Sequence, residues 1–78
     1  MALTLVFLGR LEDLAGAGSR EVPLVPSLAA VIAGLEPDLA EALSGPRIRY
    51  AVNGTLVQGE AALADGDEIA FLPPVSGG

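Results

Sequence analysis

The stretch RIRYAVNGTLV, residues 47–57, has the pattern of a β-hairpin. Ile48, Tyr50 and Val52 alternate with arginine, alanine and asparagine, and side chains two residues apart point to the same face of a strand. Asn53-Gly54 follows, a dipeptide that favours the tight turns of two-residue hairpin loops. The next three residues, Thr-Leu-Val, continue as a short return strand. The stretch therefore predicts two antiparallel strands that meet at Asn53-Gly54.

Beyond this hairpin, LADGDEIAFLPP, residues 63–74, predicts a turn and the last strand. Asp65-Gly66 is typical of turns, and Glu68–Leu72 has the apolar composition of a strand. Pro73 and Pro74 end that strand, because proline has no N–H to donate to a neighbouring strand. The acidic residues at 65, 67 and 68 lack the ligand spacing of a calcium site, so they are interpreted as turn-forming, solvated groups. We expect a domain over residues 1–72 and an extended tail over residues 73–78.

The N-terminal part of the chain predicts a second hairpin. LTLVFLG, residues 3–9, favours a strand whose two faces are both nearly apolar, as in strands buried on both sides. Residues 10–16 form a short polar turn with leucines at helical spacing, and residues 19–24 predict the second strand. Pro23 indicates that this second strand lies at a sheet edge. A domain this small can cover only one face of its sheet, so a partner is expected to cover the other.

The middle of the chain has helical periodicity. Ser27 is a good N-cap, and four apolar residues follow at the spacing of one helix face: Leu28, Val31, Ile32 and Leu35. Pro37 favours the start of a second short helix over residues 37–43, which Gly45 and Pro46 would end. Two hairpins around this helix predict an α+β fold, with a mixed sheet of four to five strands and one main helix on one face.

The composition excludes several classes of function. The chain has 78 residues, no Cys and no His, so it has no disulfide, no zinc-finger or iron–sulfur ligation by Cys, and no Cys or His nucleophile or base. We expect no metal site. Its net charge of −6, with four arginines and no lysine, argues against binding to nucleic acid or to an anionic membrane and suits a basic protein partner. No segment has the length of a membrane span, and the apolar start lacks the basic region of a signal peptide, so we expect a cytoplasmic protein.

The uncovered sheet face and the tail are the candidate functional regions. We expect the partner to bind at the ends of the first and last strands, through Leu72, Phe71, Leu8 and Phe7. In the tail, Pro73 and Pro74 favour an extended stem, and the tail reaches about 18–20 Å. Gly77 and Gly78 have no side chains, so the tail, residues Pro73, Pro74, Val75, Ser76 and Gly77, can thread a narrow channel. The terminal carboxylate of Gly78 would then be the working group.

These residues carry a resemblance to a known family. AVNGTLV, residues 51–57, and LADGDEIAFLPPVSGG, residues 63–78, are similar to the small, sulfur-carrying subunits of molybdopterin synthase, in the ubiquitin-like β-grasp superfamily. The resemblance covers the whole chain. It implies that an adenylyltransferase like those that activate ubiquitin consumes ATP to adenylate Gly78, and that sulfur from a donor protein then converts the adenylate to a thiocarboxylate.

The resemblance also implies how the sulfur is used. The large catalytic subunit of the synthase would accept it for the cyclic pterin precursor of the molybdenum cofactor, in a heterotetramer of two small and two large subunits. The small subunit would hold no permanent cofactor and contribute no catalytic side chain, acting as the sulfur donor of a sulfurtransferase. Three alternatives stay open: a sulfur carrier for thiamine or amino-acid biosynthesis, a ubiquitin-like protein modifier, and an inert interaction domain.

Overall fold

A computed structural model of the chain describes residues 1–58 and 61–74, and within them the chain forms one mixed sheet. Its strands are β1 (Ala2–Phe7), β2 (Ser19–Pro23), β3 (Arg49–Val52), β4 (Thr55–Val57) and β5 (Glu68–Leu72), in the order β2-β1-β5-β3-β4. β1 and β5 are parallel, and the other neighbouring pairs are antiparallel. Both predicted hairpins are confirmed, and β2, which ends in Pro23, lies at a sheet edge as predicted.

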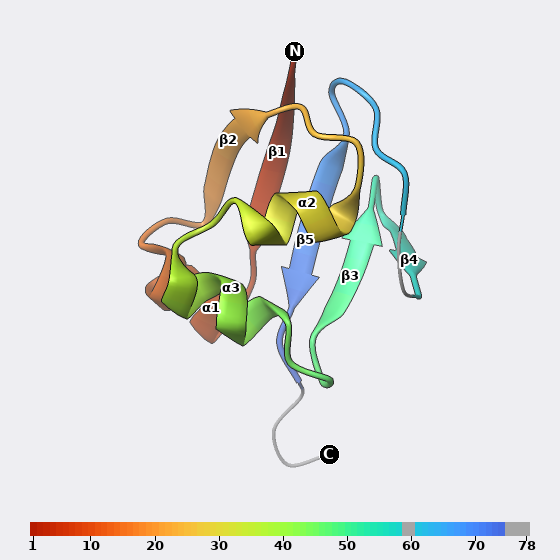
Figure 1. The fold of residues 1–78 in the computed structure, drawn as a ribbon. Coiled ribbons are helices and arrows are strands. Elements are labelled where there is room, and N and C mark those ends of the chain that lie inside the picture. The colour runs from red at the N-terminus through yellow and green to blue at the C-terminus, as the bar shows by residue number, and fades with distance from the viewer. Residues whose placement is uncertain (59–60, 75–78) are drawn as a thin grey trace.

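Short helices cover one face of this sheet (Figure 1). They are α1 (Arg10–Ala15), α2 (Leu28–Ala33) and α3 (Pro37–Leu43). The Ser27 hydroxyl accepts a hydrogen bond from the Ala30 N–H at 3.2 Å, which confirms the predicted N-cap. α2 is shorter than the predicted helix, because Gly34 caps it and the chain turns extended before Pro37 at the start of α3. α3 confirms the second short helix predicted over residues 37–43, and α1 lies in the segment 10–16, where the leucines have helical spacing. None of the helices in the described ranges has the length and apolar character needed to cross a membrane.

The core lies between the sheet and the helices. Leu3, Leu5 and Phe7 of β1 and Ile69 and Phe71 of β5 supply its sheet side, all at most 2% exposed. The helix side is supplied by Leu11, Leu28, Val31, Leu39 and Leu43. Ile32 and Leu35 are half-buried and pack against this core, so the predicted helix face is confirmed as the packing face.

Aromatic side chains concentrate at the end of the core where β5 ends. The Phe7 and Phe71 rings stack with centroids 5.5 Å apart, and Tyr50 meets Phe71 edge-on at 5.8 Å. The Tyr50 hydroxyl donates a hydrogen bond to the Leu43 carbonyl, which ties β3 to α3. Burial raises the pKa of Tyr50. Aromatic pairs in these arrangements add roughly 0.5–1.5 kcal/mol beyond the area that they bury, so the end of β5 is firmly held.

Candidate functional site

β5 is the central strand, and its two ends differ in chemistry. It begins beside the end of β3 and ends where β1 ends and β3 begins, as Figure 1 shows. We call the first the turn end, formed by residues 53–54 and 64–68. We call the second the tail end, formed by residues 8–10, 47–49 and 72–74. The predicted tail follows directly after the tail end.

The polar groups of the turn end bond to one another. The Asn53 side chain donates to Asp67 Oδ1 at 2.9 Å and accepts from the Glu68 N–H at 3.0 Å. Asp67 Oδ2 accepts from the Ala64 N–H at 2.9 Å, and Asp65 Oδ1 accepts from the Ala2 N–H at 2.8 Å. These donors, first the Ala64 N–H and then the Asn53 amide, lower the pKa of Asp67. The interpretation of Asp65 and Asp67 as turn-forming groups is therefore confirmed, while Glu68 offers its exposed side chain to solvent.

The tail end presents apolar side chains on the face of the sheet away from the helices. Leu8 is 41% exposed and Leu72 is half-buried. Val6 pairs with Ala70 in register, and Ala70 with Ala51, so small apolar side chains line this face across the three central strands, although Ala51 is only 8% exposed. None of the helices among the described residues covers this face, and Leu8 and Leu72 lie on it as expected, while binding of a partner there stays a prediction. We call Val6, Leu8, Ala51, Ala70 and Leu72 the open-face patch.

The expectation that Phe7 and Phe71 also lie on this surface is wrong. Phe7 is 2% exposed and Phe71 is fully buried, and both point to the helices. The reason is the period of two: Leu8 and Leu72 are their neighbours in sequence and therefore point to the opposite face. Because β1 is apolar on both faces, the sequence pattern by itself did not say which face the helices cover.

The start of the tail packs against a glycine turn. Pro73 and Pro74 are half-buried, and a Cβ built on Gly9 would lie only 2.9 Å from Pro73 Cγ. Gly9 also has a φ of 56° and a ψ of −136°, a conformation that is essentially confined to glycine. Gly9 thus fixes both the start of α1 and the side on which Pro73 passes. The predicted residues Val75, Ser76, Gly77 and Gly78 lie outside the described residues.

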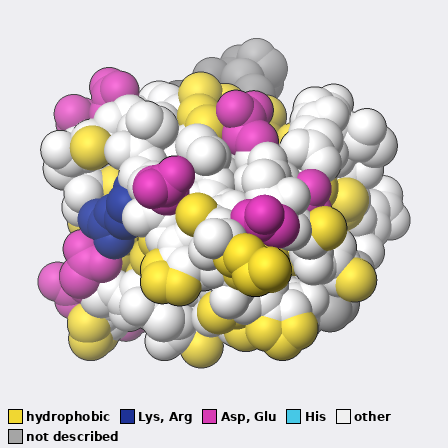
Figure 2. Space-filling view, turned by 90° about the horizontal axis from the view of Figure 1, so that it is seen from above, with side chains coloured by type: hydrophobic (Ala, Val, Ile, Leu, Met, Phe, Trp, Pro, Cys, Tyr) yellow, Lys and Arg dark blue, Asp and Glu magenta, His cyan; other side chains and the backbone are white. Residues whose placement is uncertain are grey.

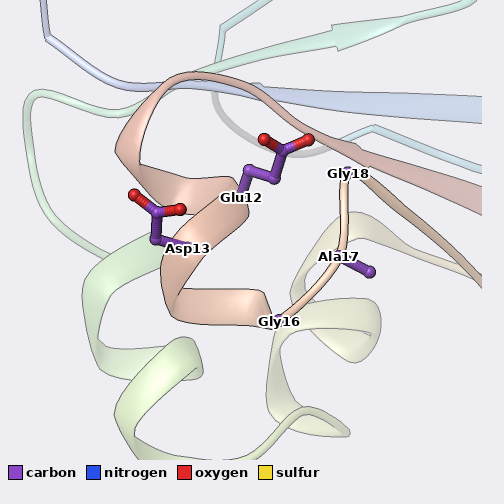
Figure 3. Close-up of a pocket in the computed structure, with 5 residues that line it drawn as sticks. All are labelled: Glu12, Asp13, Gly16, Ala17 and Gly18. Carbon is purple, nitrogen blue, oxygen red and sulfur yellow. The ribbon is translucent and has the colours of Figure 1, made fainter.

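A shallow hollow of about 380 Å³ lies over α1 and the loop that follows it (Figure 3). It is lined by Glu12, Asp13, Gly16, Ala17 and Gly18, and the Glu12 carboxylate points toward Gly18. Two carboxylates would repel a phosphate, so the glycines of this loop do not form a nucleotide site. Within residues 1–58 and 61–74 no three acidic side chains gather to hold a metal ion.

One ion pair, between Arg20 and Glu36, was not predicted from the sequence. The Arg20 guanidinium contacts both carboxylate oxygens of Glu36, at 2.6 and 3.1 Å, and donates to the Ala15 carbonyl at 3.0 Å. It also lies 5.8 Å from the Phe7 ring centroid. The hydrogen bond between the two charges raises the pKa of Arg20 and lowers that of Glu36. Arg20 therefore joins β2 to the segment before α3, and no local pattern in the sequence connects residues this far apart.

Known proteins resemble the chain over its whole length. It is 38% identical to the molybdopterin synthase sulfur carrier subunit of Escherichia coli (strain K12) over 80 residues, which cover 97% of this chain and 99% of that relative. The crystal structure of SAMP1 from Haloferax volcanii has a TM-score of 0.82 at 24% identity, with both chains fully covered, a likeness that shows the fold alone. The complex of subunits 1 and 2 of the molybdopterin-converting factor from Helicobacter pylori 26695 contains a chain with a TM-score of 0.72 at 27% identity, again with full coverage of both.

These comparisons agree with the architecture and with the sequence resemblance. The strand order and the helices on one face are those of the ubiquitin-like β-grasp, as predicted. Residues 5–78, nearly the whole chain, match the ThiS family. The chain therefore belongs to the ThiS family.

Proposed function

We propose that the chain is the sulfur carrier subunit of a molybdopterin synthase. The observation that carries this proposal is the 38% identity to the Escherichia coli sulfur carrier subunit over 97% of this chain and 99% of the relative. The match to the ThiS family supports the same role, and it runs from residue 5 to residue 78 and so includes the tail. The assignment of the tail rests on the same match, because residues 75–78 lie outside the described part of the structure.

The chemistry proceeds in two steps at Gly78. A carboxylate is a poor electrophile, so an adenylyltransferase first joins a carboxylate oxygen to the α-phosphate of ATP and releases pyrophosphate. Sulfur that a donor protein supplies at the oxidation level of sulfide, as hydrosulfide, then attacks the acyl carbon and forms a C–S bond. AMP leaves with the bridging oxygen, the sulfur loses its proton, and Gly78 carries a thiocarboxylate. ATP is consumed by the activating partner and is not a resident cofactor of the carrier. The chain needs no catalytic side chain of its own for either step.

The partner that receives the sulfur is the large catalytic subunit. Two observations on the tail end support this assignment. The open-face patch includes Leu8 and Leu72 beside the start of the tail, and none of the helices in the described part of the chain covers it. Pro73, the first residue of the tail, packs against Gly9 and therefore lies beside that patch. A subunit that covers the patch therefore also receives the tail, and we place it in an assembly of two small and two large subunits.

The same fold also serves other sulfur carriers and protein modifiers, so the experiment must separate them. The purified chain is incubated with ATP, an adenylyltransferase and a sulfur donor, and intact mass spectrometry measures the gain expected when one oxygen is exchanged for sulfur. The charged protein is then mixed with the large synthase subunit and the pterin precursor. We expect the mass gain, its loss on mixing, and the pterin dithiolene product.

Two other results would assign the chain elsewhere. A charged protein that gives no pterin product but serves a thiamine or cysteine synthase would be a carrier of another pathway. Conjugation of Gly78 to the lysines of other proteins would identify a modifier. Absence of any mass gain with a competent adenylyltransferase would leave only an interaction domain.

A further inference from the structure

Three of the four arginines of the chain lie at the tail end. Arg10 begins α1 directly after Gly9, and Arg49 pairs in register with Leu72, the last residue of β5. Arg47 lies two residues before Arg49, in the segment that leads into β3. β5 lies between β1 and β3, so the start of the tail has Arg10 on one side and Arg47 and Arg49 on the other.

All three guanidinium groups are available to a partner. Arg10, Arg47 and Arg49 are exposed, and none forms an ion pair with another residue of the described ranges. Arg20 is different, because it is held by Glu36 and the Ala15 carbonyl. The position of Arg49 is the most informative. Its register partner Leu72 belongs to the open-face patch, and directly paired residues of antiparallel strands have their side chains on the same face.

The turn end of the molecule carries acidic side chains. Figure 2, which looks from above onto the end where β5 begins, shows acidic side chains across that surface and one patch of arginine at its left side. Asp65, Asp67 and Glu68 lie at this turn end. Within a net charge of −6, three arginines therefore surround the start of the tail, with Glu12 and Asp13 of α1 next to Arg10.

We propose that Arg49 and Arg47, with a smaller contribution from Arg10, form a cationic rim around the start of the tail that docks on carboxylates of the partner surface that receives it. The inference rests on the proposed function and specifies the chemistry of that partner: an apolar centre that covers Leu8 and Leu72, bordered by Asp or Glu side chains. It replaces the expectation of a basic partner drawn from net charge. Arg10 contributes less because Glu12 and Asp13 lie beside it on α1.

The arrangement favours a protein over a polyanion as the ligand of these arginines. Protein interfaces commonly combine an apolar centre with a polar rim and are enriched in arginine. The open-face patch next to Arg49 supplies such a centre, and a nucleic acid would not cover it. A polyanion would also be repelled by the remainder of this acidic chain. Rim charges act mainly on the association rate and on the salt dependence of binding, which gives the inference a readout that lost packing would not produce.

The test measures binding to the large synthase subunit by titration calorimetry at low and at high sodium chloride concentration. The variants are Arg49→Gln and the double variant Arg47→Gln/Arg49→Gln. The matched control is Thr55→Glu, which shifts the net charge by the same amount as one arginine replacement, at an exposed position next to the turn end. At low salt we expect the double variant to bind roughly three- to tenfold more weakly than the parent, with Arg49→Gln in between. Thr55→Glu should bind like the parent, and the salt dependence of the double variant should be shallower.

The outcomes separate this inference from the proposed function. If the parent binds the large subunit and both arginine variants bind equally well at both salt concentrations, the cationic rim is wrong and the proposed function stands. If the parent does not bind the large subunit at all, the proposed function fails and the inference fails with it. If sedimentation shows a salt-sensitive dimer of the parent that the double variant lacks, the rim belongs to an interface between copies of this chain, which also overturns the inference.

Discussion

The two ends of β5 use their polar and apolar groups in opposite ways. At the turn end, Asn53, Asp65 and Asp67 have hydrogen-bond partners within the chain, so these side chains stabilise the fold. At the tail end, the arginines and the open-face patch have no such partners in the described residues. Groups that a fold leaves without internal partners are available to other molecules. The same strand therefore separates a region that stabilises the domain from a region that binds.

The division is sharpest between two adjacent residues. Phe71 is fully buried between Phe7 and Tyr50, whereas Leu72 lies half-buried on the other face of the sheet. Phe71→Ala should lower the free energy of unfolding by roughly 3–5 kcal/mol, because it leaves a cavity in the core. Leu72→Ala should cost less than about 1 kcal/mol but weaken binding to the large subunit. Urea unfolding and calorimetry measure the two effects.

Equal losses of stability in the two variants would contradict this division of β5. If Phe71→Ala does not accumulate as a folded protein, Phe71→Leu provides the same comparison with a smaller cavity. Its loss of stability should still exceed that of Leu72→Ala.

Gly9 tests whether the fold also directs the tail. Gly9→Ala should cost about 1–3 kcal/mol, because alanine is strained at that backbone conformation and its Cβ would lie 2.9 Å from Pro73 Cγ. Gly16→Ala is the matched control, since Gly16 also has a positive φ, 82°, but nothing lies within 4 Å of its added Cβ. Both variants should lose stability in urea unfolding, and Gly9→Ala should in addition slow thiocarboxylate formation. Equal rates of charging would show that the Gly9–Pro73 contact has no part in presenting the tail.

The sequence predicted much of this fold through local signals, and the features that it did not predict depend on contacts between residues far apart in the chain. The alternation around Tyr50, the Asn53-Gly54 turn and the Ser27 cap are local signals, and the hairpins and helix starts that they predicted are present. The parallel pairing of β1 with β5 joins residues more than sixty positions apart, and no local pattern encodes it.

That pairing decides which residues form the site. It brings Leu8 beside the end of β5 and gathers Arg10 and Arg49 around the same point. It also turns Phe7 and Phe71 into the core, against the prediction. The alternation predicts which side chains share a face of the sheet. Because β1 is apolar on both faces, it does not predict which face the helices cover, and that is seen only in the structure.

Replacing Tyr50 tests how much its contacts with α3 and β5 stabilise the tail end. Its hydroxyl donates to the Leu43 carbonyl, and its ring contacts Phe71. Tyr50→Phe keeps the ring and removes the hydrogen bond, so it should lower the free energy of unfolding by about 0.5–1.5 kcal/mol. Urea unfolding measures the loss, and binding to the large subunit should be unchanged. Unchanged stability would show that the hydroxyl does not tie β3 to α3.

The smallest expected effect lies at the turn end and depends on pH. Hydrogen bonds lower the pKa of Asp67 in the folded state, so in acid the unfolded chain binds a proton that the folded chain does not. Its contribution to stability is present above the ordinary carboxyl pKa, near 3.9, and disappears as the pH falls through the lowered folded value. Asp67→Asn should therefore have a shallower loss of stability in acid than the parent. Parallel acid profiles for the two proteins, measured by unfolding at a series of pH values, would contradict this role of Asp67.

The central claim is that the carboxylate of Gly78 carries the sulfur, and intact mass spectrometry after activation tests it most directly. The parent, a variant with one residue appended after Gly78 and the variant Gly77→Val are compared, with circular dichroism to verify their folds. The appended residue places the carboxyl group of Gly78 in a peptide bond, so no adenylate can form there, and the β-branched valine stiffens and widens the slim end of the tail. We predict that all three fold alike, that the parent gains the mass of an oxygen-to-sulfur exchange, and that the appended variant gains none. A variant that keeps its appended residue and still gains that mass would contradict the account.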